Sequence, residues 1–178
     1  MKYVQVTVAV PSRDALHGAL KRAKGVLHQK HLPSFFTYGV GILNLEEDQV
    51  SALEKDLMVL SINEIRQYNQ GDEVEVASVF CLDRKVKGDD GRKHRQVIQS
   101  AEAMPIFKKL AGLRPSDEKD HKQVAASAGP LVAPRFINHN TFSVGLLAIV
   151  EDAETFNRAL IHGVGHHGSY GYGLLRVK

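Results

Sequence analysis

The sequence has very little of what marks several large classes of protein. Its single cysteine, Cys81, has no partner for an internal disulfide, and one thiolate is too few for a cysteine-based zinc site. Tryptophan is absent, and no apolar run approaches the length that spans a bilayer. The opening residues Met1-Lys-Tyr-Val begin a strand pattern instead of a signal peptide. We therefore expect a cytoplasmic protein without a membrane partner, with Cys81 as a buried, inert thiol.

The composition fits an ordinary globular protein and does not name a function. Hydrophobic residues make up 43% of the chain and charged residues 24%. The net charge of +3 permits a nucleic-acid partner but does not demand one. A length of 178 residues is enough for one domain or two compact ones.

The first half alternates strand and helix patterns. Residues 2–10 alternate with a period of two, which predicts a strand. Ser12 or Asp14 suits the N-cap of a helix that runs to about His31, where Leu32-Pro33 stops it. We further predict a strand over 35–43, a helix over 46–60 and a long strand over 73–86, with room for a short extra strand between the last two.

The second half begins with turn residues over 87–92, which predict a hairpin. Pro105 suits the first turn of a helix over 106–111, and Gly112 suits its end. Residues 123–136 contain two prolines and predict an irregular strand or loop. The last elements are a strand over 141–150, a helix with Asp152 as N-cap and Gly163 as stop, and a closing strand over 173–177. This order is ferredoxin-like.

Both halves together predict an α+β protein with tandem ferredoxin-like (RRM-like) domains and a C-terminal glycine-rich loop. We place the domains at 1–88 and 89–178, each too small for a stable core alone, so that they would pack together.

The glycine-rich segment 163–173 interleaves five glycines with side chains that donate hydrogen bonds or stack. The residues Gly163-Val-Gly165-His-His-Gly168 match the residue pattern of the dinucleotide-binding fingerprint. In a dinucleotide site, however, a strand precedes this pattern and a helix follows it. Here the order is helix, loop and strand, which excludes it. Two interpretations remain, a flexible tail and a loop that lies against a polyanion.

The order from Thr141 to the end resembles the CRISPR RNA-processing endoribonucleases of the RAMP superfamily, most closely those of E-type Cascade systems. The resemblance rests on a strand, an Asp-led helix, the turn Gly163-Val-Gly165 and the strand Tyr172-Gly-Leu-Leu175. It implies metal-independent cleavage of a CRISPR repeat RNA stem-loop, with no cofactor. Other subunits of a CRISPR effector complex are further candidate partners.

The predicted hairpin carries cations on both arms, which is either an ordinary solvated face or a patch that neutralises phosphates. In the resembled family this region is a basic hairpin. We predict an RNA-binding surface made of the hairpin cations and the glycine-rich loop, namely Lys85, Lys87, Arg92, Lys93, Arg95, Gly163, Gly165, His166, His167, Gly168, Ser169, Tyr170 and Gly171.

Catalysis in the resembled family depends on a histidine in or just after the first helix. Imidazole can take or give a proton at neutral pH. His17 and His28 are eleven residues apart and share one helical face. Leu27-His28-Gln29 resembles the family's motif, so His28 is favoured and His17 is the alternative, while both could simply line a helix surface. Tyr38 is a candidate to orient the histidine or donate a proton.

No metal site is predicted, because the carboxylates are not paired at ligand spacing and the C-terminal histidines lack acidic or cysteine partners. Two other functions stay open, a non-catalytic RAMP subunit that binds RNA within an effector complex, and a ferredoxin-like module that binds a small ligand.

Overall fold

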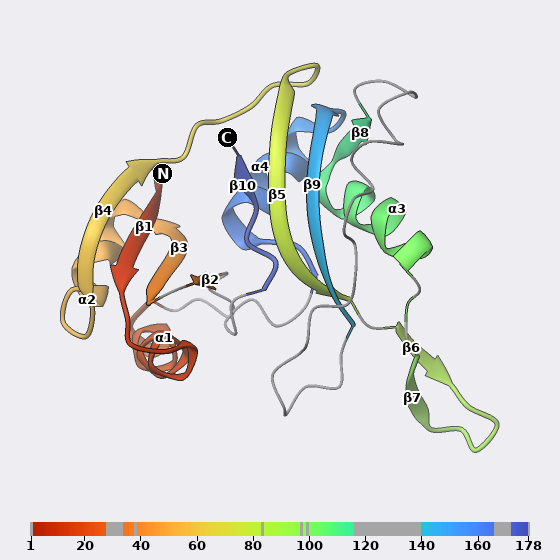
Figure 1. Cartoon of the computed structure of the whole chain (residues 1–178), viewed down its shortest axis with the longest axis horizontal. Coiled ribbons are helices and arrows are strands. Elements are labelled where there is room, and N and C mark those ends of the chain that lie inside the picture. Colours follow the sequence, from red (N-terminus) through yellow and green to blue (C-terminus); the bar gives the residue numbers. More distant parts are fainter. Residues whose placement is uncertain are drawn as a thin grey trace.

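The computed structural model describes most of the chain, namely residues 2–27, 34–37, 39–82, 84–96, 98, 100–115, 140–165 and 172–177. These residues form two four-stranded antiparallel sheets and a separate two-stranded hairpin. Figure 1 shows the first sheet at the left, the second right of centre and the hairpin at the lower right. The predicted α+β architecture is therefore present. Within the described residues, no helix has the length and apolar character needed to span a membrane.

The first sheet is built around β1 (Tyr3–Ala9), whose residues alternate between buried and half-buried positions as the period of two predicts. Its neighbours are β3 (Val40–Glu46) and β4 (Met58–Glu64), and β2 (Ser34–Thr37) lies outside β3. All of these strands pair antiparallel, so β4 forms one edge of the sheet.

The pattern prediction for residues 35–60 was partly wrong. The single predicted strand is a hairpin of β2 and β3, because Gly39 adopts a φ of 80° and turns the chain. The predicted helix contains only η1 (Glu47–Gln49) and α2 (Val50–Leu53), and the chain then enters β4. The apolar spacing suits a helix for one turn. The residues that follow form a strand instead, because they pair with the open edge of β1.

Helix α1 (Arg13–Leu27) packs against the first sheet. The Ser12 hydroxyl oxygen accepts a hydrogen bond from the Ala15 N–H at 3.1 Å, which confirms Ser12 as its N-cap. Burial of each large apolar side chain in this core contributes roughly 1.5–3 kcal/mol. The core contains Val4, Val6, Val8, Val10, Leu16, Leu20, Leu43, Leu45, Val50 and Leu53. The predicted extension of α1 to His31 lies outside the described residues.

The second sheet has the order β10-β5-β9-β8. Its centre is the pair β5 (Glu73–Leu82) and β9 (Asn140–Val150), which run antiparallel from Glu73↔Ile149 to Leu82↔Asn140. β8 (Leu113–Pro115) pairs with β9, and β10 (Arg176–Val177) pairs with β5. The predicted strand over 141–150 is confirmed.

The predicted closing strand over 173–177 forms only at β10, although Leu174 and Leu175 are buried as expected. The predicted strand over 73–86 ends at Leu82. It lies in the second sheet, although we assigned it to the first half, so the change of sheet falls between β4 and β5. The domain division at residue 88 stays a prediction.

Helix α3 (Ser100–Ala111) begins earlier than the sequence suggested. Pro105 lies inside the helix and not in its first turn, which corrects that prediction. Ala103, Phe107 and Ala111 are buried at four-residue spacing, and this apolar face extends the helix toward its N-terminus. Gly112 ends the helix at a φ of 64°, as predicted.

Helix α4 (Ala153–His162) begins and ends as the sequence predicted. An Asp152 carboxylate oxygen accepts a hydrogen bond from the Thr155 N–H at 3.0 Å. The hydrogen bond from the Thr155 hydroxyl, followed by this N–H contact, lowers the pKa of Asp152. Gly163 follows at a φ of 74°, and its N–H donates to the Ala159 carbonyl at 2.8 Å.

Specific contacts join the two sheets. The Asn44 amide on β3 donates to the Leu160 carbonyl on α4. Tyr68, in the segment between β4 and β5, exchanges two hydrogen bonds with the Asn157 side chain, at 2.9 and 2.8 Å. Because an amide side chain here bonds both backbone groups of one residue, it fixes the position of the connecting segment on α4.

Candidate nucleic-acid interface

The N-terminal turn of α1 contacts the end of the glycine-rich segment. An Arg13 guanidinium nitrogen donates to the Tyr172 hydroxyl at 3.1 Å, and the guanidinium lies 5.2 Å from the centre of the Tyr172 ring. Tyr172 is buried, with 4% of its surface exposed. His17 follows Arg13 by one helical turn and therefore lies on the same side of α1. This side of α1 thus faces Tyr172, at the end of the glycine-rich segment.

The described ends of the glycine-rich loop pack on β5. The Gly173 N–H donates to the Val79 carbonyl at 2.6 Å, and its own carbonyl accepts from Val164 at 2.8 Å. Gly165 has a φ of 77°, and a Cβ there would collide with the Cys81 carbonyl. Gly165 is therefore required for close packing against the chain itself. Cys81 is buried, as predicted.

The basic hairpin consists of β6 (Arg84–Lys87) and β7 (Lys93–Gln96). The register places Lys87 opposite Lys93, and Lys85 opposite Arg95. Both pairs join residues of like charge, an arrangement that destabilises a strand pair unless an anion neutralises it. Lys87, Arg92 and Lys93 are exposed, and none of them forms an ion pair within the described part of the chain. These three cations of the hairpin therefore face solvent.

The hairpin turn is held by its own side chains. An Asp90 carboxylate oxygen accepts from the Arg92 N–H at 2.9 Å and lies 2.9 Å from the His94 Nε2 atom. The His94 contact, followed by the Arg92 contact, lowers the pKa of Asp90 below its usual value. Gly91 has a φ of 75° and completes the turn. This bonding orders the turn that carries Arg92.

The described ends of the glycine-rich segment contact both α1 and the strand that leads to the basic hairpin. The loop is tied to α1 through Tyr172, and to the last residues of β5 through Gly165. β5 leads directly to the hairpin, whose first described residue is Arg84. In Figure 1, α1 lies at the lower left and the hairpin at the lower right.

Several predicted site residues lie outside the described residues, namely His28, Tyr38, His166, His167, Gly168, Ser169, Tyr170 and Gly171. Lys85 and Arg95 are described through their backbone pairing. Gly163 is described as the residue that ends α4.

Sequence reasoning missed Arg13 and Tyr172. The four-residue spacing of Arg13 and His17 was a usable signal for a shared helical side. Nothing in the sequence indicates that Tyr172, 159 positions away, contacts that side.

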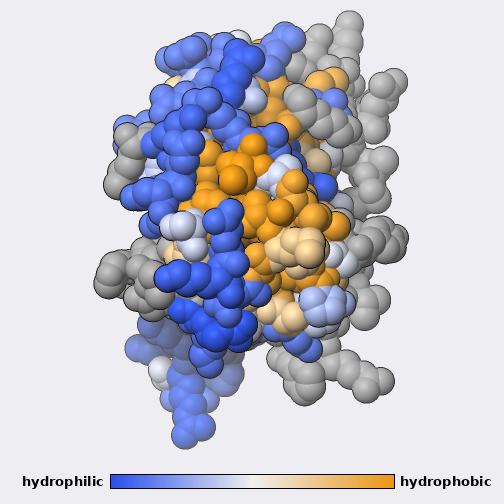
Figure 2. Space-filling model, turned by 90° about the vertical axis from the view of Figure 1, so that its left-hand side faces the viewer, coloured by the Kyte–Doolittle hydropathy of each residue, from blue (hydrophilic) through white to orange (hydrophobic). Residues whose placement is uncertain are grey.

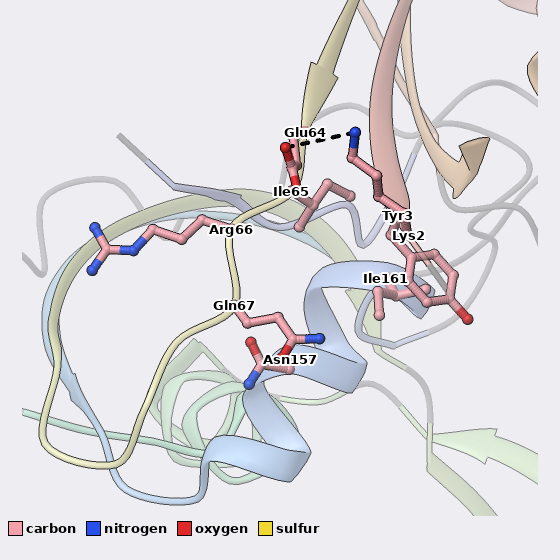
Figure 3. A pocket seen from close by; sticks show the side chains of 8 residues that line it. All are labelled: Lys2, Tyr3, Glu64, Ile65, Arg66, Gln67, Asn157 and Ile161. Atoms are coloured by element: carbon pink, nitrogen blue, oxygen red, sulfur yellow. Dashed lines mark ion pairs between the residues drawn. The ribbon is translucent and has the colours of Figure 1, made fainter.

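A cavity of about 520 Å³ lies elsewhere, between the start of β1, the segment after β4 and helix α4. Figure 3 shows Lys2 directed toward Glu64, at 3.7 Å, with Arg66 extending away from this pair. Lys2 also lies 3.3 Å from Glu47, and this hydrogen bond raises the pKa of Lys2. The charge of Lys2 is thus neutralised within the chain, and none of the predicted site residues that the structure describes lines the cavity. Its lining residues are Lys2, Tyr3, Glu64, Ile65, Arg66, Gln67, Asn157 and Ile161.

Among the described residues, no group of three or more histidine, cysteine or acidic side chains is arranged to hold a metal ion. The side chain of α1 that is best suited to transfer a proton near neutral pH is the imidazole of His17.

Solved structures of similar fold cover essentially the whole chain. Thermus thermophilus Cse3, bound to an RNA representing a pre-cleavage complex, is 15% identical with a TM-score of 0.68 and full coverage of both chains. The chain has the Cse3 fold. The CRISPR endoribonuclease Cse3 bound to a 19-nucleotide RNA gives 16% identity and a TM-score of 0.70, over 99% of this chain and 98% of that one. A chain of a CRISPR RNA-guided surveillance complex gives 14% identity and a TM-score of 0.61, over 98% of each chain.

The family model described as CRISPR associated protein matches residues 108–178. This match and the similar solved structures agree with the resemblance that the C-terminal segment indicated. The solved structures confirm the tandem ferredoxin-like fold class. No curated protein matches the sequence.

Proposed function

We propose that the chain is an endoribonuclease that binds a CRISPR repeat stem-loop and cleaves precursor crRNA. The observation that carries the proposal is that the glycine-rich segment contacts both α1 and the end of β5, from which the basic hairpin follows, on the Cse3 fold. The Cse3 structures of similar fold contain RNA, one of them a pre-cleavage complex. We expect the hairpin cations to hold the phosphates while α1 supplies the proton-transfer group.

The proposed reaction needs no metal ion. A histidine takes the proton from the ribose 2′-hydroxyl, whose oxygen attacks the adjacent phosphorus as the bond to the 5′-oxygen breaks. A second donor protonates the departing 5′-oxygen. The products are a 2′,3′-cyclic phosphate and a 5′-hydroxyl. Negative charge grows on the phosphate during the attack, so a neighbouring cation or backbone N–H would stabilise the transition state.

His17 and His28 are the two candidates for proton transfer, with Tyr38 as a candidate for orientation or proton donation. The sequence motif favours His28. The contact between Arg13 and Tyr172 supports His17, because it directs that side of α1 toward the glycine-rich loop. We infer that Arg13 is a positioning residue that holds the loop at a set place beside α1.

The test is cleavage of an end-labelled repeat stem-loop by the purified chain in excess chelator. We expect a cyclic phosphate product, and we expect a 2′-deoxy substitution at the nucleotide before the scissile bond to abolish it. Cleavage that requires a divalent ion, or that survives the deoxy substitution, would refute the mechanism.

The second candidate function is a non-catalytic RNA-binding subunit of a CRISPR effector complex. The chain of a surveillance complex with the same fold supports it. This function predicts salt-sensitive binding of the same RNA without any cut. If the chain does not bind this RNA, or if its RNA affinity does not depend on salt concentration, a module that binds a small ligand is favoured instead. A cytoplasmic location remains a prediction.

A further inference from the structure

A single side-chain contact joins an edge strand of the first sheet to an edge strand of the second. Among the described strands, β2 lies at one edge of its sheet and β10 at one edge of the other. The guanidinium of Arg176 on β10 lies over the ring of Phe35 on β2, 4.2 Å from the ring centre. In Figure 1, both strands lie near the middle of the view, between β3 and β5. Arg176 therefore lies where the two sheets approach each other.

The guanidinium of Arg176 lacks the partner that a buried cation needs. Its Nε atom is buried without a hydrogen-bond partner, and none of the ion pairs among the described residues includes Arg176. Burial lowers the pKa of Arg176, because desolvation disfavours the charged form. The Phe35 ring attracts the cation, but it offers no oxygen that could accept a hydrogen bond. The charge of Arg176 thus stays uncompensated within the part of the chain that the structure describes.

The other arginines whose side chains are described do not share this feature. Arg13 is also half-buried, but it donates to the Tyr172 hydroxyl at 3.1 Å. Arg66 lies 5.2 Å from the centre of the Tyr68 ring, but it is exposed, so water can accept its hydrogen bonds. The remaining ones are exposed as well, namely Arg22, Arg92, Arg114 and Arg158. The environment of Arg176 is therefore that of a built site and not of an ordinary surface cation.

The chain leads to this contact from both segments that we expect to lie beside the RNA. Arg176 follows Tyr172 by four positions, and Tyr172, at the end of the glycine-rich segment, contacts α1. Four residues span at most about 14 Å, so the two Cα atoms lie within that distance of each other. Phe35 follows the candidate histidine His28 by seven positions. An RNA beside α1 and the glycine-rich segment would therefore pass close to Arg176.

We propose that Arg176, held in place by the Phe35 ring, binds a backbone phosphate of the RNA. The proposal rests on the proposed function, because it adds a contact to the same RNA. The Nε atom is enclosed and Arg176 is half-buried, so the phosphate would meet the Nη atoms at the end of the guanidinium. Two parallel N–H groups suit the oxygens of a phosphate, whose charge would compensate that of the guanidinium. Arg176 is then a substrate-binding residue and takes no part in proton transfer.

Substitution of Arg176 separates RNA binding from a structural role. Arg176→Met keeps an unbranched side chain against Phe35 and removes the uncompensated charge, so the melting temperature should not fall. RNA affinity, measured by fluorescence anisotropy, should fall by about 10–100-fold, as expected for a charge-assisted contact. The slope of log affinity against log salt should fall by about 0.7–0.9. Arg176→Lys keeps the charge but loses the paired donors, so it should recover only part of the affinity.

Arg66→Met is the matched control, because Arg66 also lies over an aromatic ring but is exposed. Arg66 follows β4 by two residues. On the side of the molecule where β4 lies, Figure 2 shows an apolar patch, and β4 exposes Met58, Leu60 and Ile62 there. Such a surface offers nothing to a phosphate, so the affinity and the salt slope of Arg66→Met should equal those of wild type.

Neutral linkages identify the phosphate that Arg176 contacts. Each RNA of a series carries one methylphosphonate, which removes the charge of a single phosphate, and a 2′-deoxy nucleotide before the scissile bond prevents cleavage. At one linkage the substitution should weaken binding to wild type by about 10–100-fold. At that linkage it should weaken binding to Arg176→Met by less than about twofold, because the variant has already lost the contact.

The outcomes distinguish this proposal from the proposed function. If Arg176→Met binds and cleaves the RNA as wild type does, the phosphate contact is refuted and the endoribonuclease stands. If no linkage shows the coupled loss, or if the melting temperature falls together with the affinity, Arg176 only joins the two sheets and the proposal is refuted. If Arg176→Met loses affinity as expected but wild type never cleaves, the phosphate contact stands and the catalytic function falls. A wild-type chain that does not bind the RNA would overturn both.

Discussion

The salt dependence of RNA binding offers the sharpest test of the hairpin. Replacing Lys87, Arg92 and Lys93 by alanine removes three exposed cations that belong to neither core. It also relieves the like-charge pair of Lys87 with Lys93, so the melting temperature should not fall. Loss of RNA affinity would then reflect lost phosphate contacts and not lost structure.

The magnitude follows from counterion release. Each phosphate contact contributes about 0.9 to the slope of log affinity against log salt on a duplex, so three contacts contribute about 2.7. Between about 50 and about 200 mM salt, wild type should therefore lose roughly 40-fold more affinity than the variant. A fluorescence-anisotropy titration of a labelled stem-loop at four salt concentrations measures both slopes.

The matched control removes three exposed cations from other surfaces. Lys55, Arg66 and Arg158 lie after α2, after β4 and on α4. Their replacement by alanine lowers the net charge equally, so it should leave the slope nearly unchanged. Equal slopes of log affinity against log salt for wild type and the hairpin variant would show that these cations contact solvent and not RNA phosphates.

Four further outcomes are expected. His28→Ala or His17→Ala should reduce single-turnover cleavage by about 10²–10⁴-fold with unchanged RNA affinity, and full activity in both variants would exclude a helix histidine. Cleavage should be equal in chelator and in Mg²⁺, measured by product yield on gels. Tyr172→Phe keeps the ring but loses the hydroxyl contact with Arg13, so the cleavage rate should fall by up to about tenfold while the RNA affinity is unchanged. An equal fall in cleavage rate and RNA affinity would show that the contact is merely structural. Gly165→Ala should destabilise the fold by at least about 1–2 kcal/mol in denaturant unfolding, because alanine disfavours its positive φ and meets the Cys81 carbonyl.

Local signals in the sequence predicted local structure well. Asp152 and Gly163 were identifiable as the ends of α4, because capping depends on the chemistry of one or two residues. The hairpin was equally visible, since Gly88 and Gly91 lie within a few positions of the cations that they separate.

The failures come from partners that are distant in sequence. The stretch that ends in β4 resembled a helix, and only the open edge of β1 makes it a strand. The sequence did not show that β5 pairs with β9, because this pairing joins residues more than fifty positions apart. Arg13 and Tyr172 were missed as a pair for the same reason. Local pattern cannot show which of several strands will be neighbours.

The two hydrogen bonds between Tyr68 and Asn157 have a mechanical consequence. They clamp the connecting segment to α4, while Asn44 holds the first sheet to the same helix. The position of the first sheet relative to α4 is then a property of the folded chain and not of its ligand. An RNA bound beside α1 would therefore meet α4 and the first sheet at a fixed spacing, and it would not have to order them on binding.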